Sequence, residues 1–376
     1  MVKKLYIIAG EASGDLHASN LIKAIQTKDG TIDFQFWGGD RMKSVAKKEP
    51  VKHIKELAFM GFIEVILNLR TILKNIKFCK QNILEYQPDA LVLIDYPGFN
   101  LRIAEWAKKQ GITVYYYISP QVWAWKQKRV HTIKKVVDRM FVILPFEKDF
   151  YAQFDMQVDY VGHPLMDVIL PIKSKENELA IRKKLALSQK PLIVILPGSR
   201  KQEIQIKLPI MLKGVQSFKN HEVVVAGAPS MDYYFYEPFL RNYSNVKWID
   251  NATYELLSIA EGAVVTSGTA TLETALFEVP QVVCYKGSFI SYWIAKRLVK
   301  IKYISLVNLI LDKEAVKELI QKECKPKNIE KELLKVLPSG ENHQQLNTNY
   351  KKLITLLGVG GTSKKVADGI LSQKEK

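Results

Sequence analysis

Two strand-to-helix turns in the second half of the chain carry residue types that bind phosphate groups. Residues 197–200 (Pro-Gly-Ser-Arg) follow an apolar strand, and residues 267–273 (SGTATLE) follow another and open a helix. Backbone N–H groups and the helix dipole at such a turn attract an anion. Arg200 could hold a diphosphate through two hydrogen bonds, and Glu273 could accept two ribose hydroxyls. A nucleoside-diphosphate site is therefore predicted from Ser199, Arg200, Ser267, Gly268, Thr269 and Glu273.

A purely structural role is the alternative at each turn. Ser267 and Thr269 could simply cap the helix, and Glu273 could be a solvated helix residue. The chain has no GxxxxGK[ST] sequence, which disfavours phosphoryl transfer from ATP, and no Asp-x-Asp pair to hold a sugar nucleotide through a metal. We therefore expect neither metal nor cofactor, with the diphosphate neutralised by Arg200, N–H groups and a helix dipole.

Three residues in the first half are candidates for a general base. Asp95 ends the all-apolar strand predicted at 90–94, and a carboxylate in apolar surroundings has a raised pKa that suits proton abstraction. Asp15 and His17 belong to the loop GEASGD (10–15) and the helix that it opens. Asp95 and Asp15 could instead each cap a helix. We favour Asp95 as the base and leave Asp15 and His17 as competitors.

Two loops in the first half of the chain, 10–15 and 119–125, hold candidates for substrate contact. The loop at 10–15 lacks the GxGxxG fingerprint, which disfavours dinucleotide binding, but its N–H groups and Ser13 could contact a substrate. The stretch SPQVWAW (119–125) brings two tryptophans to a strand end. Trp123 could stack on a sugar ring or an acyl chain, and an ordinary core tryptophan is the alternative.

Short all-apolar strands alternate with helices and glycine-bearing turns along the chain. This pattern indicates parallel sheets covered on both faces, with ligands beyond the carboxyl ends of the strands. A break falls near Gly162-His163-Pro164, after which the pattern restarts. The predicted fold class is α/β, with two Rossmann-like, doubly wound domains facing across a cleft. We place them at 1–163 and 164–350, followed by a helical tail at 351–376 that packs back on the first domain.

The amino-acid composition indicates which cellular compartment and which binding partners to expect. Among 376 residues, 55 Lys and Arg stand against 38 Asp and Glu, a net charge of +17. Such an excess indicates a polyanionic partner, namely nucleic acid, anionic lipid or a phosphorylated substrate, unless the composition is simply rich in lysine. The three cysteines are scattered without a CxxC pair, which favours a reducing compartment. Without an export signal or a run of 18 apolar residues, we expect a cytoplasmic protein.

Eight motifs in order resemble those of the lipid-A-disaccharide synthases: GEASGD (10–15), DYPGFN (95–100), SPQVWAW (119–125), PFE (145–147), VGHPL (161–165), LPGSR (196–200), SGTATLE (267–273) and the NL…ELIQ stretch (308–321). The resemblance covers nearly the whole chain. It implies a GT-B inverting glycosyltransferase that joins UDP-2,3-diacylglucosamine to 2,3-diacylglucosamine 1-phosphate and releases UDP and a β-1,6-linked disaccharide.

The resemblance also assigns residues. It implies that Asp95 deprotonates the acceptor 6-hydroxyl, and it adds Asn308, Glu318 and Gln321 as weaker donor-side candidates. The chain departs from the family pattern at Gln121, where a small polar residue is usual, and at Val307, where proline usually precedes the asparagine.

The acyl chains of these substrates imply peripheral contact with the cytoplasmic face of the inner membrane. Segment 57–76 is more apolar than one buried helical stripe requires, and basic residues follow Trp293 at 296–302. We expect both to face the membrane, with Lys74, Lys77 and Lys80 near head groups, unless the first segment is a buried core helix. A homodimer is a further assembly that the sequence leaves open.

Two other functions stay as alternatives. A UDP-sugar 2-epimerase would share the two-domain plan and the UDP pocket, but it would need no acyl-binding surface. A basic nucleic-acid-binding protein would explain the charge. However, no known binding module occurs and the basic residues are dispersed along the chain, so we expect no nucleic-acid partner.

Overall fold

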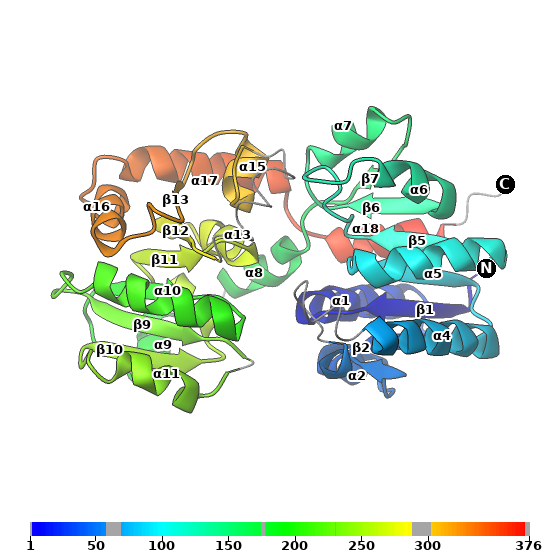
Figure 1. Cartoon of the computed structure of the whole chain (residues 1–376), viewed down its shortest axis with the longest axis horizontal. Helices are drawn as coiled ribbons and strands as arrows, with labels where there is room; N and C mark the ends of the chain where they lie inside the picture. The colour runs from blue at the N-terminus through cyan, green and yellow to red at the C-terminus, as the bar shows by residue number, and fades with distance from the viewer. Residues whose placement is uncertain (1, 58–68, 174–176, 230, 288–301, 373–376) are drawn as a thin grey trace. The chain divides into compact units, whose positions relative to one another are not determined.

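The chain forms two compact units, each built on its own sheet (Figure 1). The computed structural model describes residues 2–57, 69–173, 177–229, 231–287 and 302–372. The first unit comprises Met1–Pro164 and Gly360–Lys376, and the second comprises Leu165–Val359.

The first unit contains a seven-stranded sheet in the order β3-β2-β1-β4-β5-β6-β7, and all of its strand pairs are parallel. The strands are β1 (Lys4–Ala9), β2 (Asp33–Gly38), β3 (Lys52–His53), β4 (Ala90–Ile94), β5 (Thr113–Tyr117), β6 (Arg139–Val142) and β7 (Asp159–Tyr160). The helices are α1 (Ala12–Lys28), α2 (Asp40–Ala46), the 3₁₀ turn η1 (Ile54–Glu56), α4 (Leu69–Tyr86), α5 (Pro97–Lys109), α6 (Arg129–Val136), α7 (Glu147–Ala152) and α18 (Thr362–Leu371).

Burial explains why these segments become strands and helices. Every residue of β4 is buried, as expected for a parallel strand that is covered on both faces. In α1, Ala18, Leu21, Ile22 and Ile25 recur at helical spacing and join the buried core of the sheet. The strand order reverses between β1 and β4, so the turns after these two strands diverge at the point where α/β sheets bind ligands.

The second unit repeats the design with six parallel strands in the order β10-β9-β8-β11-β12-β13. The strands are β8 (Leu192–Leu196), β9 (Glu222–Gly227), β10 (Val246–Asp250), β11 (Gly262–Thr266), β12 (Gln281–Tyr285) and β13 (Lys317–Ile320). The helices are α8 (Leu165–Lys173), α9 (Glu178–Lys184), α10 (Lys201–Gly214), α11 (Tyr233–Leu240), α12 (Thr253–Ser258), α13 (Thr269–Leu276), α15 (Leu306–Leu311), α16 (Pro326–Val336) and α17 (His343–Leu357). Here the strand order reverses between β8 and β11.

The C-terminal tail is shorter than the sequence indicated. The expected start at residue 351 falls inside α17, whose buried Tyr350 and Leu353 make it part of the second unit. The segment that joins the first unit begins at Gly360. There α18 packs against α1, Lys28 pairs with Asp368, and the Arg139 Nη1 donates to the Gly369 carbonyl at 2.6 Å.

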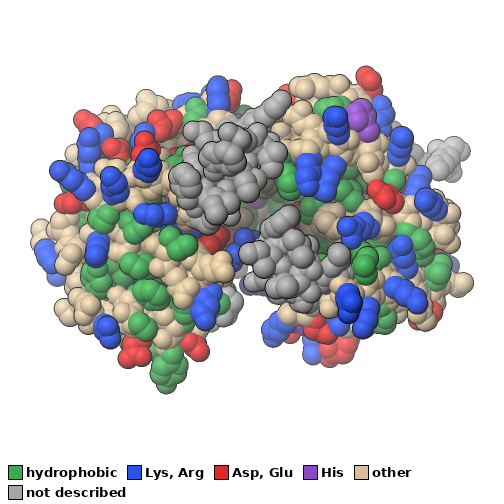
Figure 2. Space-filling view, viewed as in Figure 1, with side chains coloured by type: hydrophobic (Ala, Val, Ile, Leu, Met, Phe, Trp, Pro, Cys, Tyr) green, Lys and Arg blue, Asp and Glu red, His purple; other side chains and the backbone are tan. Residues whose placement is uncertain are grey.

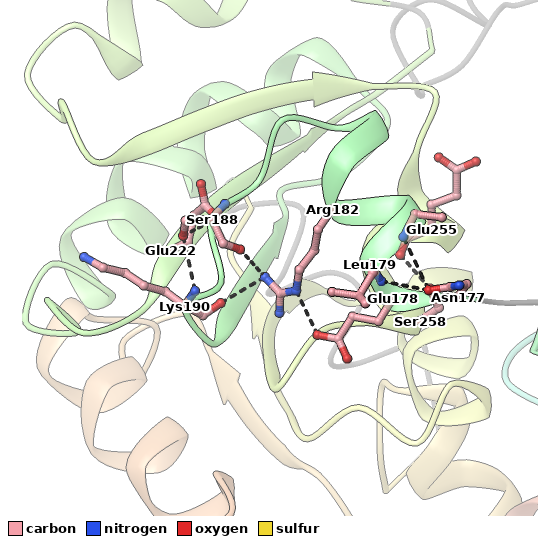
Figure 3. Close-up of polar contacts among 10 residues, drawn as sticks. Asn177, Glu178, Leu179, Arg182, Ser188, Lys190, Glu222, Glu255 and Ser258 are labelled. Atoms are coloured by element: carbon pink, nitrogen blue, oxygen red, sulfur yellow. Dashed lines mark hydrogen bonds and ion pairs between the residues drawn. The ribbon is translucent and has the colours of Figure 1, made fainter.

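A buried arginine forms hydrogen bonds at the edge of the second sheet where the strands begin (Figure 3). Arg182 is only 5% exposed, and its Nη1 donates to the carbonyls of Ser188 and Lys190 at 2.6 and 3.0 Å. The Ser188 N–H and hydroxyl in turn donate to Glu222 at 2.8 and 2.9 Å. Because Lys190 precedes β8 and Glu222 opens β9, this network lies at the strand ends opposite the ligand edge and has a structural role.

No helix in the described part of the chain is long and apolar enough to cross a bilayer. Most of the expected membrane-facing segment lies outside the described residues, since 58–68 and 288–301 are not described. The described helix α4 is amphipathic, with Ile76, Cys79 and Ile83 buried while Leu73 and Phe78 are exposed.

Candidate functional site

Asp95 lies at the carboxyl edge of the first sheet in a constrained backbone. Its φ of 43° is left-handed, an unfavourable conformation for a residue other than glycine. The carbonyl of Asp95 accepts from the Tyr116 hydroxyl at 2.6 Å and from the Asn100 amide at 2.8 Å, and its N–H donates to the Tyr117 carbonyl at 3.1 Å. These bonds hold the strained backbone in place and fix the direction of the side chain.

The carboxyl group of Asp95 has the proton affinity that a base needs near neutral pH. Burial, and after it the charge of Glu11, raises the pKa of Asp95 to about 6. Asp95 does not cap α5, because that helix begins at Pro97 and Tyr96 occupies the cap position. The purely structural interpretation of Asp95 as a helix cap is therefore wrong.

Asp15 has a different role from either one that the sequence suggested. It is 3% exposed, and its carboxylate accepts three backbone N–H groups, from Gly39 at 2.7 Å and from Arg41 and Met42 at 3.1 Å each. These are the first amides of α2, so Asp15 caps a neighbouring helix and not its own. A carboxylate committed to three amides is poorly placed to take a substrate proton.

The first loop offers His17 and Ser13 in different environments. His17 is buried on α1 near His163. Burial lowers the pKa of His163 to about 3, and the neighbouring His17 acts in the same direction. Ser13 is exposed in the first turn of α1 and keeps its hydroxyl available to a ligand.

Glu147 is a candidate that sequence reasoning missed. It is 1% exposed, and its Oε2 accepts the N–H groups of Ile143 and Leu144 at 3.1 and 2.9 Å. Burial raises the pKa of Glu147 to about 7, while these hydrogen bonds and the side chains of Ser119 and Trp123 oppose the shift. The available signal was a carboxylate just after an apolar strand, the same signal that singled out Asp95.

The two tryptophans of the 119–125 loop lie in different environments. Trp123 is 9% exposed and packs edge-on against Phe146, with ring centroids 5.0 Å apart. Trp125 is 42% exposed, with the Lys126 ammonium 4.2 Å from its ring centroid. The core alternative therefore describes Trp123, and the indole offered to a ligand is that of Trp125.

In the second unit the two predicted turns follow adjacent strands, β8 and β11, on either side of the reversal in strand order. Ser199 and Arg200 are exposed, and Arg200 is the cap residue of α10. Gly268 caps α13 with φ of 152°, and the described part of the chain leaves open space beside it. The first turn lies beside the end of β11, since a Cβ added to Gly198 would meet the Thr266 side chain at 3.6 Å.

The hydroxyls of the α13 turn do not cap the helix. Among the residues that the structure describes, no side chain bonds the cap position of α13. The Ser267 hydroxyl donates instead to the Ile304 carbonyl at 3.2 Å, and Thr269 is exposed in the first helical turn. The capping alternative is therefore wrong, and Thr269 is the hydroxyl donor left for a ligand.

Glu273 is not a solvated helix residue. It is partly buried, and its Oε1 accepts the Tyr254 hydroxyl at 2.6 Å. Burial raises the pKa of Glu273, and the Tyr254 bond opposes the shift. The second carboxylate oxygen is the atom that can accept a ligand hydroxyl.

Two of the three weaker donor-side candidates are structural. Asn308 is fully buried; its amide donates to the Val316 carbonyl and to Glu318, and its oxygen accepts from Ala315 and Val316. Glu318 is 7% exposed and accepts the N–H groups of Ile304 and Ser305. The pair positions the 302–305 segment, which receives the Ser267 hydroxyl.

Gln321 differs from that pair. Its φ of 49° is left-handed, and its Oε1 accepts the Gly287 N–H at 3.4 Å. Its Nε2 is buried with no hydrogen-bond partner in the part of the chain that the structure describes. Since a buried unpaired donor is costly, Gln321 is the member of the set best suited to meet a ligand.

Comparison with known proteins decides the family. The family model described as lipid-A-disaccharide synthetase matches residues 5–367. The chain belongs to the lipid-A-disaccharide synthase family. Its relatives include the lipid-A-disaccharide synthases of Syntrophus aciditrophicus, 38% identical over 97% of this chain and 96% of the relative, and of Nitrosococcus oceani, 38% identical over 94% and 92%.

Solved structures share the fold at low sequence identity. The UDP-GlcNAc 2-epimerase of Neisseria meningitidis bound to UDP-GlcNAc matches with a TM-score of 0.70 at 13% identity, covering 98% of this chain and all of that one. The calicheamicin glycosyltransferase CalG4 matches with a TM-score of 0.59 at 13% identity, covering 99% and 100%. These likenesses confirm the prediction of Rossmann-like α/β domains.

Neither departure from the pattern of lipid-A-disaccharide synthases disrupts its element. Val307 is fully buried in the first turn of α15, where the backbone N–H has no acceptor within the helix. Proline and valine are therefore both compatible with this position. Gln121 is exposed at the start of the tryptophan loop, and it has room for its longer side chain.

Proposed function

We propose that the chain joins UDP-2,3-diacylglucosamine to 2,3-diacylglucosamine 1-phosphate, releasing UDP and the β-1,6-linked lipid A disaccharide 1-phosphate. The observation that carries the proposal is membership in the lipid-A-disaccharide synthase family over residues 5–367. The residues at the two sheet edges support different roles for the two units. The first unit would activate the acceptor, and the second would bind the donor.

Asp95 is the proposed general base. Its ionised carboxylate takes the proton of the acceptor 6-hydroxyl as that oxygen forms a bond to the anomeric carbon of the donor. The bond from this carbon to the diphosphate breaks, and its electron pair leaves with UDP. Attack opposite to the leaving group inverts the α-linked donor to a β product. A pKa of about 6 leaves Asp95 ionised at neutral pH while keeping it a usable base.

The second unit holds the departing diphosphate. Arg200 supplies a planar pair of N–H donors, and the first turn of α13 supplies backbone N–H groups, the Thr269 hydroxyl and the helix dipole. Glu273 accepts a ribose hydroxyl through its second oxygen. Negative charge grows on UDP as the bond breaks, so these donors bind the transition state more tightly than the donor substrate.

The first unit also has features suited to peripheral contact with the cytoplasmic face of the inner membrane. Exposed Leu73 and Phe78 on α4 share that helix with the exposed lysines Lys74 and Lys77. On the face shown in Figure 2, the Lys and Arg side chains are spread widely rather than gathered into one patch, which does not favour nucleic-acid binding.

The test is UDP release from the diacylated donor, measured with and without the acceptor. We expect UDP and disaccharide to appear together and only when the acceptor is present. The Asp95→Asn protein, purified in the same way, controls for a contaminating transferase. Conversion of UDP-GlcNAc to its 2-epimer, with no disaccharide from the diacylated pair, would instead establish the epimerase alternative.

A further inference from the structure

A group of basic residues lies on the loop that links β5 to α6, in the first unit. Residues 118–128 leave the carboxyl end of β5 and lead into α6 at Arg129. Strand β5 pairs directly with β4, and Ile94 opposite Tyr117 is the last residue before Asp95. The group therefore belongs to the sheet edge that carries the proposed base, yet the catalytic step described above does not use it.

A tight turn brings Lys126 and Arg129 together. Lys126 has a left-handed φ of 57°, and its carbonyl accepts the Arg129 N–H at 2.9 Å. The Lys126 ammonium lies 4.2 Å from the ring centroid of the exposed Trp125. Burial lowers the pKa of Lys126, and the nearby positive charge of Arg129 acts in the same direction. Two like charges are thus held side by side.

The described part of the chain provides no carboxylate as a counter-charge for these cations. In the described part of the chain, no carboxylate forms an ion pair with Lys126, Lys128 or Arg129, although Arg129 is partly buried. Basic residues of neighbouring elements are paired: Lys108 with Asp138, and Arg139 with Asp159 at 2.6 Å. A partly buried arginine beside a lysine, with no described carboxylate paired to either, favours the binding of an anion.

Arg129 lies near Tyr116, a direct neighbour of the proposed base. Burial raises the pKa of Tyr116 well above its usual value and Asp95 adds to the shift, whereas Arg129 opposes it. The Tyr116 hydroxyl is the group that donates to the Asp95 carbonyl at 2.6 Å. A ligand held by Arg129 would therefore lie near the residue that activates the acceptor.

We propose that Lys126 and Arg129, beside the exposed indole of Trp125, bind the phosphomonoester of the acceptor. This assignment rests on the proposed function, which requires an acceptor with a phosphate at C1 and a reacting hydroxyl at C6. The guanidinium can hold two phosphate oxygens and the ammonium supplies a second charge, so the dianion neutralises the pair. The phosphate then fixes which end of the sugar faces Asp95.

The experiment compares two acceptors, 2,3-diacylglucosamine 1-phosphate and the same lipid without phosphate, in neutral detergent micelles free of anionic lipid. The kcat/KM for each acceptor is measured for the unchanged protein, Arg129→Ala, Arg129→Lys and Lys126→Ala. Lys135→Ala, an exposed lysine in the last turn of the same helix, is the matched control.

We expect the unchanged protein to prefer the phosphorylated acceptor. Arg129→Ala should lose about 10–100-fold on that acceptor and little on the other, as for a lost hydrogen bond to a charged group. Lys126→Ala and Arg129→Lys should show a smaller loss of the same kind, and Lys135→Ala none. Equal losses on both acceptors, or an unchanged preference in Arg129→Ala, would overturn the assignment. Inactivity of the unchanged protein on both acceptors would instead count against the proposed function.

Discussion

At the scale of single residues, Asp95 combines a strained backbone with a raised pKa. We expect Asp95→Asn to lower kcat by about 10²–10⁴-fold, the usual contribution of a general base, because an amide cannot take the hydroxyl proton. UDP affinity should be nearly unchanged, since the proposed UDP site is in the other unit. A His17 substitution that lowered kcat far more than Asp95→Asn would transfer the role to the first loop.

The pH dependence follows from the same residue. The proposed base can accept a proton only when it is ionised, so kcat/KM should rise as the pH passes upward through about 6 and then level off. Because folding raises this pKa, the stability that protonated Asp95 contributes is full below its unfolded pKa and is lost as the pH rises through about 6. Asp95→Asn should therefore unfold at a higher temperature than the unchanged protein at pH 8. Thermal unfolding at pH 4 and pH 8 measures the difference.

Arg200 tests the donor site. Arg200→Ala removes the proposed charge-assisted pair to the diphosphate and should cost about 2–4 kcal/mol of transition-state stabilisation. Steady-state kinetics and calorimetric titration with UDP measure the loss. Arg241→Ala, which removes an exposed arginine just after α11, is the control. Nearly full kcat/KM in Arg200→Ala would place the diphosphate elsewhere.

The sequence was sufficient to select candidate site residues, but not to predict their hydrogen-bond partners. Asp95 could be selected because it directly follows an apolar strand, and Arg200 because it ends the short turn after another; both are local signals. The role of Asp15 could not, because it depends on amides of Gly39 and Met42 that folding brings from the next βα unit. Asn308 on α15 and Glu318 on β13 likewise bond each other only after folding has brought the helix and the strand together, which no spacing rule describes.

At the scale of elements, the Arg182 network should contribute to stability and not to catalysis. Arg182→Met keeps the aliphatic stem but leaves the Ser188 and Lys190 carbonyls without their donor, at a cost of about 3 kcal/mol in the free energy of unfolding. Lys184→Ala removes only the exposed pair with Glu255 and should cost less than about 1 kcal/mol. Denaturant unfolding separates the two. Equal small losses would show that the network is not needed for stability.

Helix α4 tests the membrane proposal. Replacing exposed Leu73 and Leu84 with serine should reduce sedimentation with anionic vesicles while leaving thermal stability within a few degrees, because neither side chain is in the core. Leu179→Ser, an exposed leucine on α9 of the other unit, is the control. Unchanged vesicle binding with an intact fold would remove α4 from the membrane-facing surface.

The periodicity of the sequence was sufficient to predict the strands, but not to predict where the C-terminal tail begins. Runs such as residues 90–94 are all apolar and bounded by turn residues, and they became buried strands. The tail was misplaced because residues 351–357 continue a helix whose buried face includes Leu353 and Leu357. Only the tertiary contacts of that face determine to which unit it belongs.

At the scale of the whole molecule, the candidate sites of both units lie at the turns where the strand order reverses. In the first unit the turns after β1 and β4 carry Glu11 and Asp95, and in the second the turns after β8 and β11 carry Arg200 and Gly268. The rule that α/β sheets bind ligands where the strand order reverses thus accounts for both proposed sites, the acceptor site in the first unit and the donor site in the second.

The anomeric configuration of the product tests the central claim most directly. Inverting transfer with Asp95 as the base predicts that UDP-2,3-diacylglucosamine and the acceptor give a β-1,6-linked disaccharide, identified by the proton coupling at the new anomeric centre in NMR. One UDP should be released for each disaccharide formed. An α-linked product, or consumption of the UDP-sugar without any disaccharide, would contradict the account.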